Sequence, residues 1–193
     1  MKRKLEDLAT ISTGVHARPS DSGDLRYCYI QARNFDKFRQ LNLEGLEPWL
    51  GKSTSLQRHI LKPNEVVVAA KGNDYFGAMP ARDGIAVIPS TVFLVLRQIN
   101  EQVLPEYLIW WLNHPKNQRY LHHLAKGTSL PAINKQTLGG LEIPVPPLEK
   151  QQLIVKIAAL QTREKQLLER LTYLRETMLH RQLLVLCQGL DLG

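Results

Sequence analysis

The longest stretch without a helix breaker lies at the carboxyl end of this 193-residue chain. The prolines of segment 141–147 stop just before it, and neither Gly nor Pro recurs until Gly189. Prolines at the start and a glycine after the last turn are typical boundaries of a helix. We therefore predict one helix over residues 149–187, which at about 1.5 Å per residue is roughly 58 Å long.

Apolar side chains recur along this stretch with the period of a coiled-coil seam. Counted in heptads from Lys150, the a and d positions hold Lys150, Leu153, Ile157, Leu160, Glu164, Leu167, Leu171, Leu174, Met178, Arg181 and Val185. A stripe this narrow favours pairing with another chain over docking on the helix's own domain, because the helix is longer than a domain of the remaining size requires. We predict that dimerisation uses Leu160, Glu164, Leu167, Leu171, Leu174, Met178, Arg181 and Val185.

Two charged seam positions predict how two copies pair. In a parallel in-register dimer Glu164 would face Glu164 and Arg181 would face Arg181, which places like charges together at a partly buried seam. An antiparallel pair whose facing residue numbers sum to 345 matches Glu164 with Arg181, and Leu171 with Leu174. A shift by one heptad loses the charge match, so we predict an antiparallel homodimer in this register.

Ahead of the helix, a chain with 44% hydrophobic residues can bury one core. We predict a globular domain at 1–148, a helical spacer at 149–189 and a tail at 190–193. Strand signals, which are β-branched and aromatic runs between turn residues, occur at 27–30, 41–46, 65–70, 84–88, 91–97 and 141–145. Residues 5–14 fit a short helix or a strand entry, and Pro105 and Pro115 each open a helix. The predicted fold class is α+β, a β-rich domain with a meandering antiparallel sheet and peripheral helices, followed by one long coiled-coil helix.

Charge and composition narrow the class of partner. The net charge is +7, with 18 basic against 13 acidic residues in 1–148 and 7 against 5 in 149–193, so the excess lies mainly in the domain. A basic domain suits a polyanion, although basic proteins with other partners are common. Cys28 and Cys187 form neither a disulfide framework nor a zinc pattern, so both are predicted to be reduced, buried and structural. Without a leader or an apolar run of transmembrane length, we predict a cytoplasmic protein with no membrane partner.

Motifs for catalysis are missing from the sequence. Segment 71–77 has too few glycines at the wrong spacing for a phosphate loop, and no Asn-Pro-Pro-aromatic run of the amino-methyltransferases occurs. His122 and His123 are neighbours, about 100° apart on a helix, and cannot share a metal ion. Glu65 and Asp74 come nearest in sequence to a pair of magnesium-binding carboxylates. We predict that the chain is not an enzyme and binds neither a metal nor a cofactor.

Side chains suited to contacting DNA cluster in three loops, although for each of them an ordinary solvated role is equally open. Arg and Lys bind guanine edges, Asn and Gln bind adenine edges, and hydroxyl and amide groups suit phosphate oxygens. Trp49 is open to base stacking or to a place in the core. The candidates are Lys71, Asn73, Tyr75 and Phe76 in the first loop, Lys126, Thr128 and Ser129 in the second, and Arg33, Asn34 and Lys37 in the third.

Several segments carry a resemblance to a known family. They are Gly-Thr-Ser-Leu-Pro-Ala-Ile-Asn-Lys at 127–135, Leu-Glu-Ile-Pro-Val-Pro-Pro-Leu-Glu-Lys-Gln at 141–151 with the helix after it, and Leu-Glu-Asp-Leu-Ala-Thr-Ile-Ser-Thr-Gly at 5–14. These resemble the specificity (S) subunits of type I restriction-modification systems, in which a target recognition domain meets a helical spacer. Segment 183–189 resembles the end of that spacer. The usual subunit has two recognition domains and two spacers, and this chain has room for one of each, so it resembles a half-size form.

The resemblance implies a non-catalytic subunit for sequence-specific DNA recognition. Residues 1–148 would be the target recognition domain, and the homodimer would read a bipartite inverted-repeat site in double-stranded DNA. The implied partners are DNA methyltransferase (modification) subunits, which bind S-adenosylmethionine, and a restriction/translocase subunit. The alternative is a coiled-coil adaptor or regulator that binds protein without sequence-specific DNA binding, with its basic charge incidental.

Overall fold

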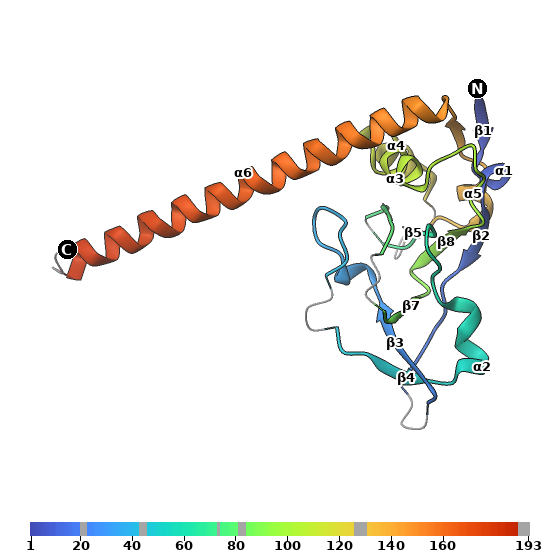
Figure 1. Cartoon of the computed structure of the whole chain (residues 1–193), viewed down its shortest axis with the longest axis horizontal. Helices are drawn as coiled ribbons and strands as arrows, with labels where there is room; N and C mark the ends of the chain where they lie inside the picture. The colour runs from blue at the N-terminus through green and yellow to red at the C-terminus, as the bar shows by residue number, and fades with distance from the viewer. Residues whose placement is uncertain (20–22, 43–45, 73, 81–83, 126–130, 189–193) are drawn as a thin grey trace. The chain divides into compact units, whose positions relative to one another are not determined.

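The computed structural model describes residues 1–19, 23–42, 46–72, 74–80, 84–125 and 131–188 (Figure 1). The chain divides into two compact units, Met1–Val155 and Lys156–Gly193. The strands of the first unit are β1 (Lys2–Lys4), β2 (Thr10–Thr13), β3 (Leu25–Ile30), β4 (Trp49–Gly51), β5 (Val66–Ala69), β6 (Gly77–Ala78), β7 (Ala86–Pro89), β8 (Phe93–Arg97) and β9 (Glu142–Pro144). Its helices are α1 (Leu5–Leu8), η1 (Ala32–Asn34), α2 (Ser53–Leu56), η2 (Gln57–His59), α3 (Pro105–Asn113), α4 (Pro115–Leu124), α5 (Lys135–Gly139) and the start of α6 (Leu148–Gln188).

Strands β2, β8, β5 and β6 form, in that order, a four-stranded antiparallel sheet in the first unit. Both faces of its central strands are buried, because alternate side chains of a strand point to opposite faces and each face meets a different core. One core takes Val66, Val68, Leu94 and Leu96, and the other takes Val67, Ala69, Phe93 and Val95. The unbroken apolar run of β5 follows from this double burial.

Helices cover the first face of this sheet. They contribute the buried leucines Leu5, Leu8, Leu108, Leu112, Leu121 and Leu138 from α1, α3, α4 and α5. The predicted helices at Pro105 and Pro115 are confirmed, with each proline at the start of its helix, where the missing N–H leaves no bond unmade. Trp110 and Trp111 are half-buried against the same core.

A second sheet, of order β4-β3-β7, covers the other face. Strand β3 pairs with β4 in antiparallel fashion and with β7 in parallel fashion, with Cys28 opposite Val87. The predicted strands at 65–70, 84–88 and 91–97 are confirmed as β5, β7 and β8. The predicted meander is wrong, since β7 leaves its neighbours for the other sheet. An apolar strand pattern is the same for either sheet, so it cannot select the partner.

Two short stretches correct the predicted boundaries. Residues 5–14 form both of the alternatives, helix α1 followed by strand β2. The strand predicted at 41–46 is wrong for the residues described there, which contribute only an isolated bridge between Leu41 and Phe35. The short strand of this region is β4, where Trp49 stacks on Tyr29 of β3 with ring centroids 4.9 Å apart.

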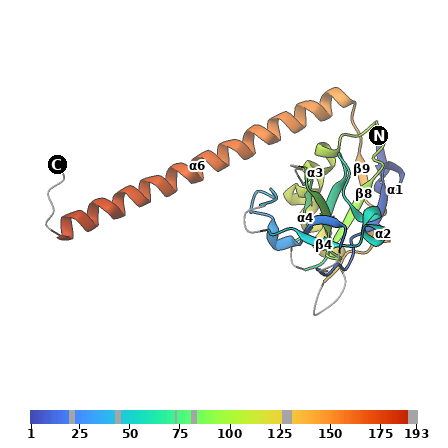
Figure 2. The same cartoon turned by 60° about the horizontal axis from the view of Figure 1, so that its bottom comes forward.

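Strands β1 and β9 join the beginning and the end of the first unit. They pair antiparallel, with Arg3 opposite Ile143, and Figure 2 shows the N-terminus of the chain beside β9. Just after β9, Gln151 in the first turns of α6 is fully buried. Its side-chain oxygen accepts the Leu104 N–H at 2.9 Å, and its amide donates to the carbonyls of Gln102 and Pro146 at 2.9 and 2.7 Å. The bonds to Leu104 and Gln102 attach the start of the helix to the loop before α3, and the bond to Pro146 holds the segment that leads into α6.

Gln151→Ala should therefore destabilise the first unit by about 2 kcal/mol, because it leaves buried backbone groups without their partner. The measurement is urea unfolding of the full chain followed by circular dichroism. Gln152→Ala is the matched control, since Gln152 is the exposed neighbour on the same helix and its truncation should change stability by less than about 0.5 kcal/mol. Equal effects of the two substitutions would contradict the role given to Gln151.

Helix α6 confirms the predicted long helix and begins one residue earlier, at Leu148. In the second unit its seam side chains Ile157, Leu160, Leu167, Leu171, Leu174 and Met178 are between 44 and 63% exposed. Cys28 is buried as predicted, but the predicted burial of Cys187 is wrong: its side chain is exposed and lies off the a/d stripe. In the part of the chain that the structure describes, no helix is both long and apolar enough to span a membrane.

Candidate nucleic-acid interface

The backbone after β5 runs beside the backbone before α5. The Ile133 N–H donates to the carbonyl of Ala70 at 2.8 Å, the Gly72 N–H donates to that of Pro131 at 3.0 Å, and Lys71 forms a β-bridge with Ala132. Lys71 and Gly72 of the first predicted loop therefore lie beside residues 131–133. Of the predicted DNA-binding residues, Asn73, Lys126, Thr128 and Ser129 lie outside the described residues.

Gly72 turns the chain away from the sheet directly after Lys71. Its φ of +103° lies in a region that side-chain-bearing residues rarely adopt. Among the residues that the structure describes, and leaving aside Gly72 and its chain neighbours, no atom lies within 4 Å of the place where a Cβ would stand. Backbone conformation, and not lack of space, therefore explains glycine at this position. The Lys71 side chain is exposed beside it.

Tyr75 and Phe76, both predicted to contact DNA, have buried side chains. Their exposed fractions are 1% and 2%, and as consecutive residues they enter the two opposite cores. The Tyr75 ring packs edge-on against His122 of α4 at 4.9 Å, and burial raises the pKa of its phenol. The Phe76 ring packs against Phe35 and Phe93 at 5.2 and 6.3 Å. Both aromatic side chains anchor the loop that precedes β6.

The loop after β3, residues 31–42, is held by its own polar side chains. Asn34 Oδ1 accepts the Gln31 N–H at 2.7 Å, which caps η1. Asp36 Oδ1 accepts the N–H groups of Phe38 and Gln40, both at 2.8 Å. The Asn34 oxygen is therefore already engaged by the backbone of its own loop. The structure thus gives Asn34 a role in shaping the loop.

Arg39 connects this 31–42 loop to the loop after β5. Its guanidinium donates to both carboxylate oxygens of Asp74, at 2.5 and 2.7 Å, and lies over the Phe76 ring at 4.7 Å from the centroid. Two parallel N–H···O bonds fix direction as well as distance, so the contact specifies how the loops meet. Sequence reasoning did not single out Arg39, and the charges alone carry no signal for this pairing because the two residues are far apart in the chain.

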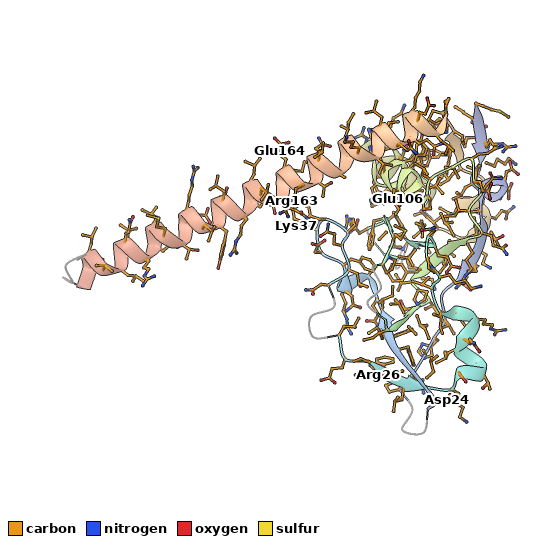
Figure 3. All side chains as sticks on the ribbon, viewed as in Figure 1. Asp24, Arg26, Lys37, Glu106, Arg163 and Glu164 are labelled. Atoms are coloured by element: carbon orange, nitrogen blue, oxygen red, sulfur yellow. The ribbon has the colours of Figure 1, made fainter. Side chains whose placement is uncertain are left out.

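Exposed cations lie on both of the joined loops. Arg33 and Lys37 are exposed on the 31–42 loop, and Figure 3 labels Lys37 there; Lys71 is exposed on the other loop. Within the described ranges, no carboxylate pairs with Arg33 or Lys71. At the N-terminus, by contrast, Lys2 pairs with Glu142 at 3.3 Å. The loops therefore offer positive charge that can meet phosphate oxygens or guanine edges.

A hollow of about 370 Å³ adjoins the 31–42 loop. The residues that line it include Tyr29, Gln31, Arg33, Asn34 and Trp49. One face of Trp49 stacks on Tyr29, and the indole also lines this hollow. Trp49, which the sequence left open, is half-buried.

The two carboxylates nearest to a metal-binding pattern do not meet. Glu65 is buried and bonds to Arg97 at 3.0 Å, whereas Asp74 bonds to Arg39. Among the residues described, no group of three or more His, Cys, Asp or Glu side chains could hold a metal ion.

Comparison with known proteins identifies the family. The family model of the type I restriction modification DNA specificity domain matches residues 1–173. The chain belongs to this family. The match includes segments 5–14, 127–135 and 141–151, on which the resemblance rested, and the family prediction is confirmed. The α+β fold class with one long terminal helix is confirmed as well.

Relatives of this specificity-domain chain are longer than it is. The type I restriction enzyme MjaVIII specificity subunit of Methanocaldococcus jannaschii is 29% identical over 98 residues, which are 51% of this chain and 22% of that protein. Two solved structures share its fold at 18% identity. One comes from work on complex assembly and conformational transition of the type I R-M system. Its TM-score is 0.69, and the match covers 94% of this chain and 43% of the other chain. The other is the HsdS subunit from Thermoanaerobacter tengcongensis. Its TM-score is 0.60, and the match covers 86% of this chain and 37% of that subunit.

Proposed function

We propose that this chain is the non-catalytic DNA-recognition part of a type I restriction-modification complex and that its first unit reads one short block of double-stranded DNA. The observation that carries the proposal is the specificity-domain family match over residues 1–173. The exposed cations Arg33, Lys37 and Lys71, on two loops joined by Arg39 and Asp74, support it. The reading surface of the proposal comprises these loops and excludes the buried Tyr75 and Phe76.

The proposal extends to an antiparallel homodimer formed through α6. Six apolar seam side chains of the second unit are exposed within one chain, and exposed apolar side chains in a continuous stripe favour a partner. The register in which facing numbers sum to 345 brings Leu171 against Leu174, Leu167 against Met178, Leu160 against Val185 and Glu164 against Arg181. A two-fold symmetric pair presents two copies of one reading surface, so its target would be two inverted copies of one block separated by unread bases.

The remaining partners of the proposal supply the catalysis. DNA methyltransferase subunits that carry S-adenosylmethionine would modify the site, and a restriction/translocase subunit would join them. The chain itself would act in the cytoplasm without a cofactor. Its part in the reaction would be to select the DNA block on which the partner subunits act.

The test is a DNA selection from random duplexes, with the full chain alone and with its methyltransferase subunit present. We expect a bipartite inverted repeat, and an affinity that falls steeply with salt because each phosphate contact releases counterions. Recovery of one uninterrupted block would contradict the dimeric arrangement. Absence of sequence selection in both preparations would contradict DNA reading and favour the coiled-coil adaptor.

Lys71→Ala should relax the preference at one base position by about 1–3 kcal/mol, the usual cost of losing a lysine contact to a base edge. Competition binding with single-base variants of the selected block measures this change. Lys2→Ala removes an equally charged and exposed side chain from strand β1, away from the two loops, and should leave the preference unchanged. An unaltered preference in the Lys71 variant would move the reading surface elsewhere.

A further inference from the structure

The 31–42 loop contains a backbone conformation that its sequence does not favour. Arg39 has a φ of +63°, in the left-handed region where residues other than Gly, Asn and Asp are uncommon. Such a conformation costs on the order of 1 kcal/mol and persists only where surrounding contacts enforce it. At Arg39 the enforcing contacts are its N–H to the Asp36 carbonyl at 2.9 Å and its guanidinium on Asp74.

The contact between Arg39 and Asp74 defines the geometry of the two loops more than it adds to the stability of the fold. The side chains are 32% and 53% exposed, and ion pairs at such exposure contribute about 1 kcal/mol or less. Beneath it, Phe35 from the 31–42 loop packs on Phe76 and Phe93, which already anchors both loops in the core. The ion pair therefore adds little to folding, while its two bonds and the stacked ring define the distance and angle between the loops.

We propose that Arg39 and Asp74 are positioning residues, which set the base preference of this domain by holding the loop of Arg33 and Lys37 in register with the loop of Lys71. The inference rests on the proposed DNA-reading function and assigns Arg39 and Asp74 a part in it. Base edges are read by donors placed to within a fraction of an ångström, so a loop free to shift loses discrimination before it loses affinity. Because Asp74 neutralises Arg39, the guanidinium is used within the protein and is not a phosphate contact.

The experiment compares Arg39→Gln, Asp74→Asn and the double variant with the wild-type full chain. The block selected by the wild type is measured against its single-base variants, together with the salt dependence of binding and the thermal unfolding midpoint. We expect each single variant to lose about tenfold in discrimination, and the double variant to lose no more than either single one. The salt dependence should stay unchanged, and the unfolding midpoint should fall by only about 2–4 °C, the shift expected for about 1 kcal/mol.

Lys2→Gln and Glu142→Gln are the matched controls, because they break another exposed ion pair of the first unit, at 3.3 Å, that touches neither loop. Both should keep full discrimination. Unchanged discrimination in the Arg39 and Asp74 variants would overturn the inference while leaving DNA reading intact. A shallower salt dependence of DNA binding in Arg39→Gln, together with tighter DNA binding in Asp74→Asn, would also overturn the inference. That pattern would identify Arg39 as a phosphate contact. A wild-type chain without sequence selection would instead overturn the proposed function itself.

Discussion

Glu164→Arg is expected to weaken the proposed homodimer about 100-fold. In the antiparallel register each dimer contains two Glu164–Arg181 pairs, and the substitution turns both into Arg–Arg pairs at a partly buried seam. A loss of about 1.4 kcal/mol per pair is modest for unit charges a few ångströms apart near a protein surface, and two such losses give the 100-fold change. Sedimentation equilibrium of the full chain at several concentrations measures the dissociation constant.

Restoration by a second change distinguishes the register from general damage. Adding Arg181→Glu to Glu164→Arg recreates two opposite-charge pairs and should return the dissociation constant to near its original value. Glu176→Arg is the matched control, because Glu176 is exposed on α6 and lies at an f position away from the seam. Failure of the double variant to recover would contradict the register, and a dimer indifferent to all three variants would contradict pairing through this seam.

Gly14→Ala should cost about 3 kcal/mol or more, enough to leave little folded protein. A Cβ on Gly14 would stand 2.0 Å from the Ser90 carbonyl oxygen and 2.6 Å from that of Pro89. Both are backbone atoms, held in place by the bonds of Gly14 N–H to the Phe93 carbonyl at 2.9 Å and of Val15 N–H to the Pro89 carbonyl at 3.0 Å. Relief of the clash therefore requires separating two backbone segments, a strain comparable with the largest effects of single substitutions.

Gly140→Ala is the matched control, because it adds the same methyl group at a position that has room for it. The nearest atom to its Cβ is the Gln136 carbonyl oxygen at 3.4 Å, and its φ of −73° is ordinary for alanine. We expect this variant to be neutral or slightly stabilised, because alanine restricts the unfolded chain. Urea unfolding and the soluble yield measure both variants, and a Gly14→Ala protein as stable as the control would contradict the close approach of residues 14 and 89–90.

The local sequence pattern was sufficient to predict several of the helices and strands. The breaker-free run with its bordering prolines predicts α6, and Pro105 and Pro115 predict the starts of α3 and α4. These signals are local because a helix satisfies its own backbone hydrogen bonds and ends where a residue cannot make them. The strands β5, β7 and β8 follow from β-branched runs between turns in the same way.

For the candidate site, the sequence indicated suitable residue types but not which of those side chains are buried. Lys71 and Arg33 were predicted and are exposed, whereas Tyr75 and Phe76 resembled reading residues and proved to be anchors in two cores. A stretch of loop residues carries no period that tells which side chains face inward. Burial at these positions depends on Phe35, Phe93 and His122, which other segments supply.

Only the tertiary structure decided which segments meet. The sequence by itself determined the class of the domain, its long helix and its family, because those depend on periodicity, breakers and motifs within single segments. It predicted a meander where β7 in fact joins β3 in a second sheet, and it carried no signal that β1 pairs with β9 or that Arg39 bonds to Asp74. Each of these contacts joins residues distant in the chain, and the free energy that selects among alternative partners comes from packing the whole first unit at once.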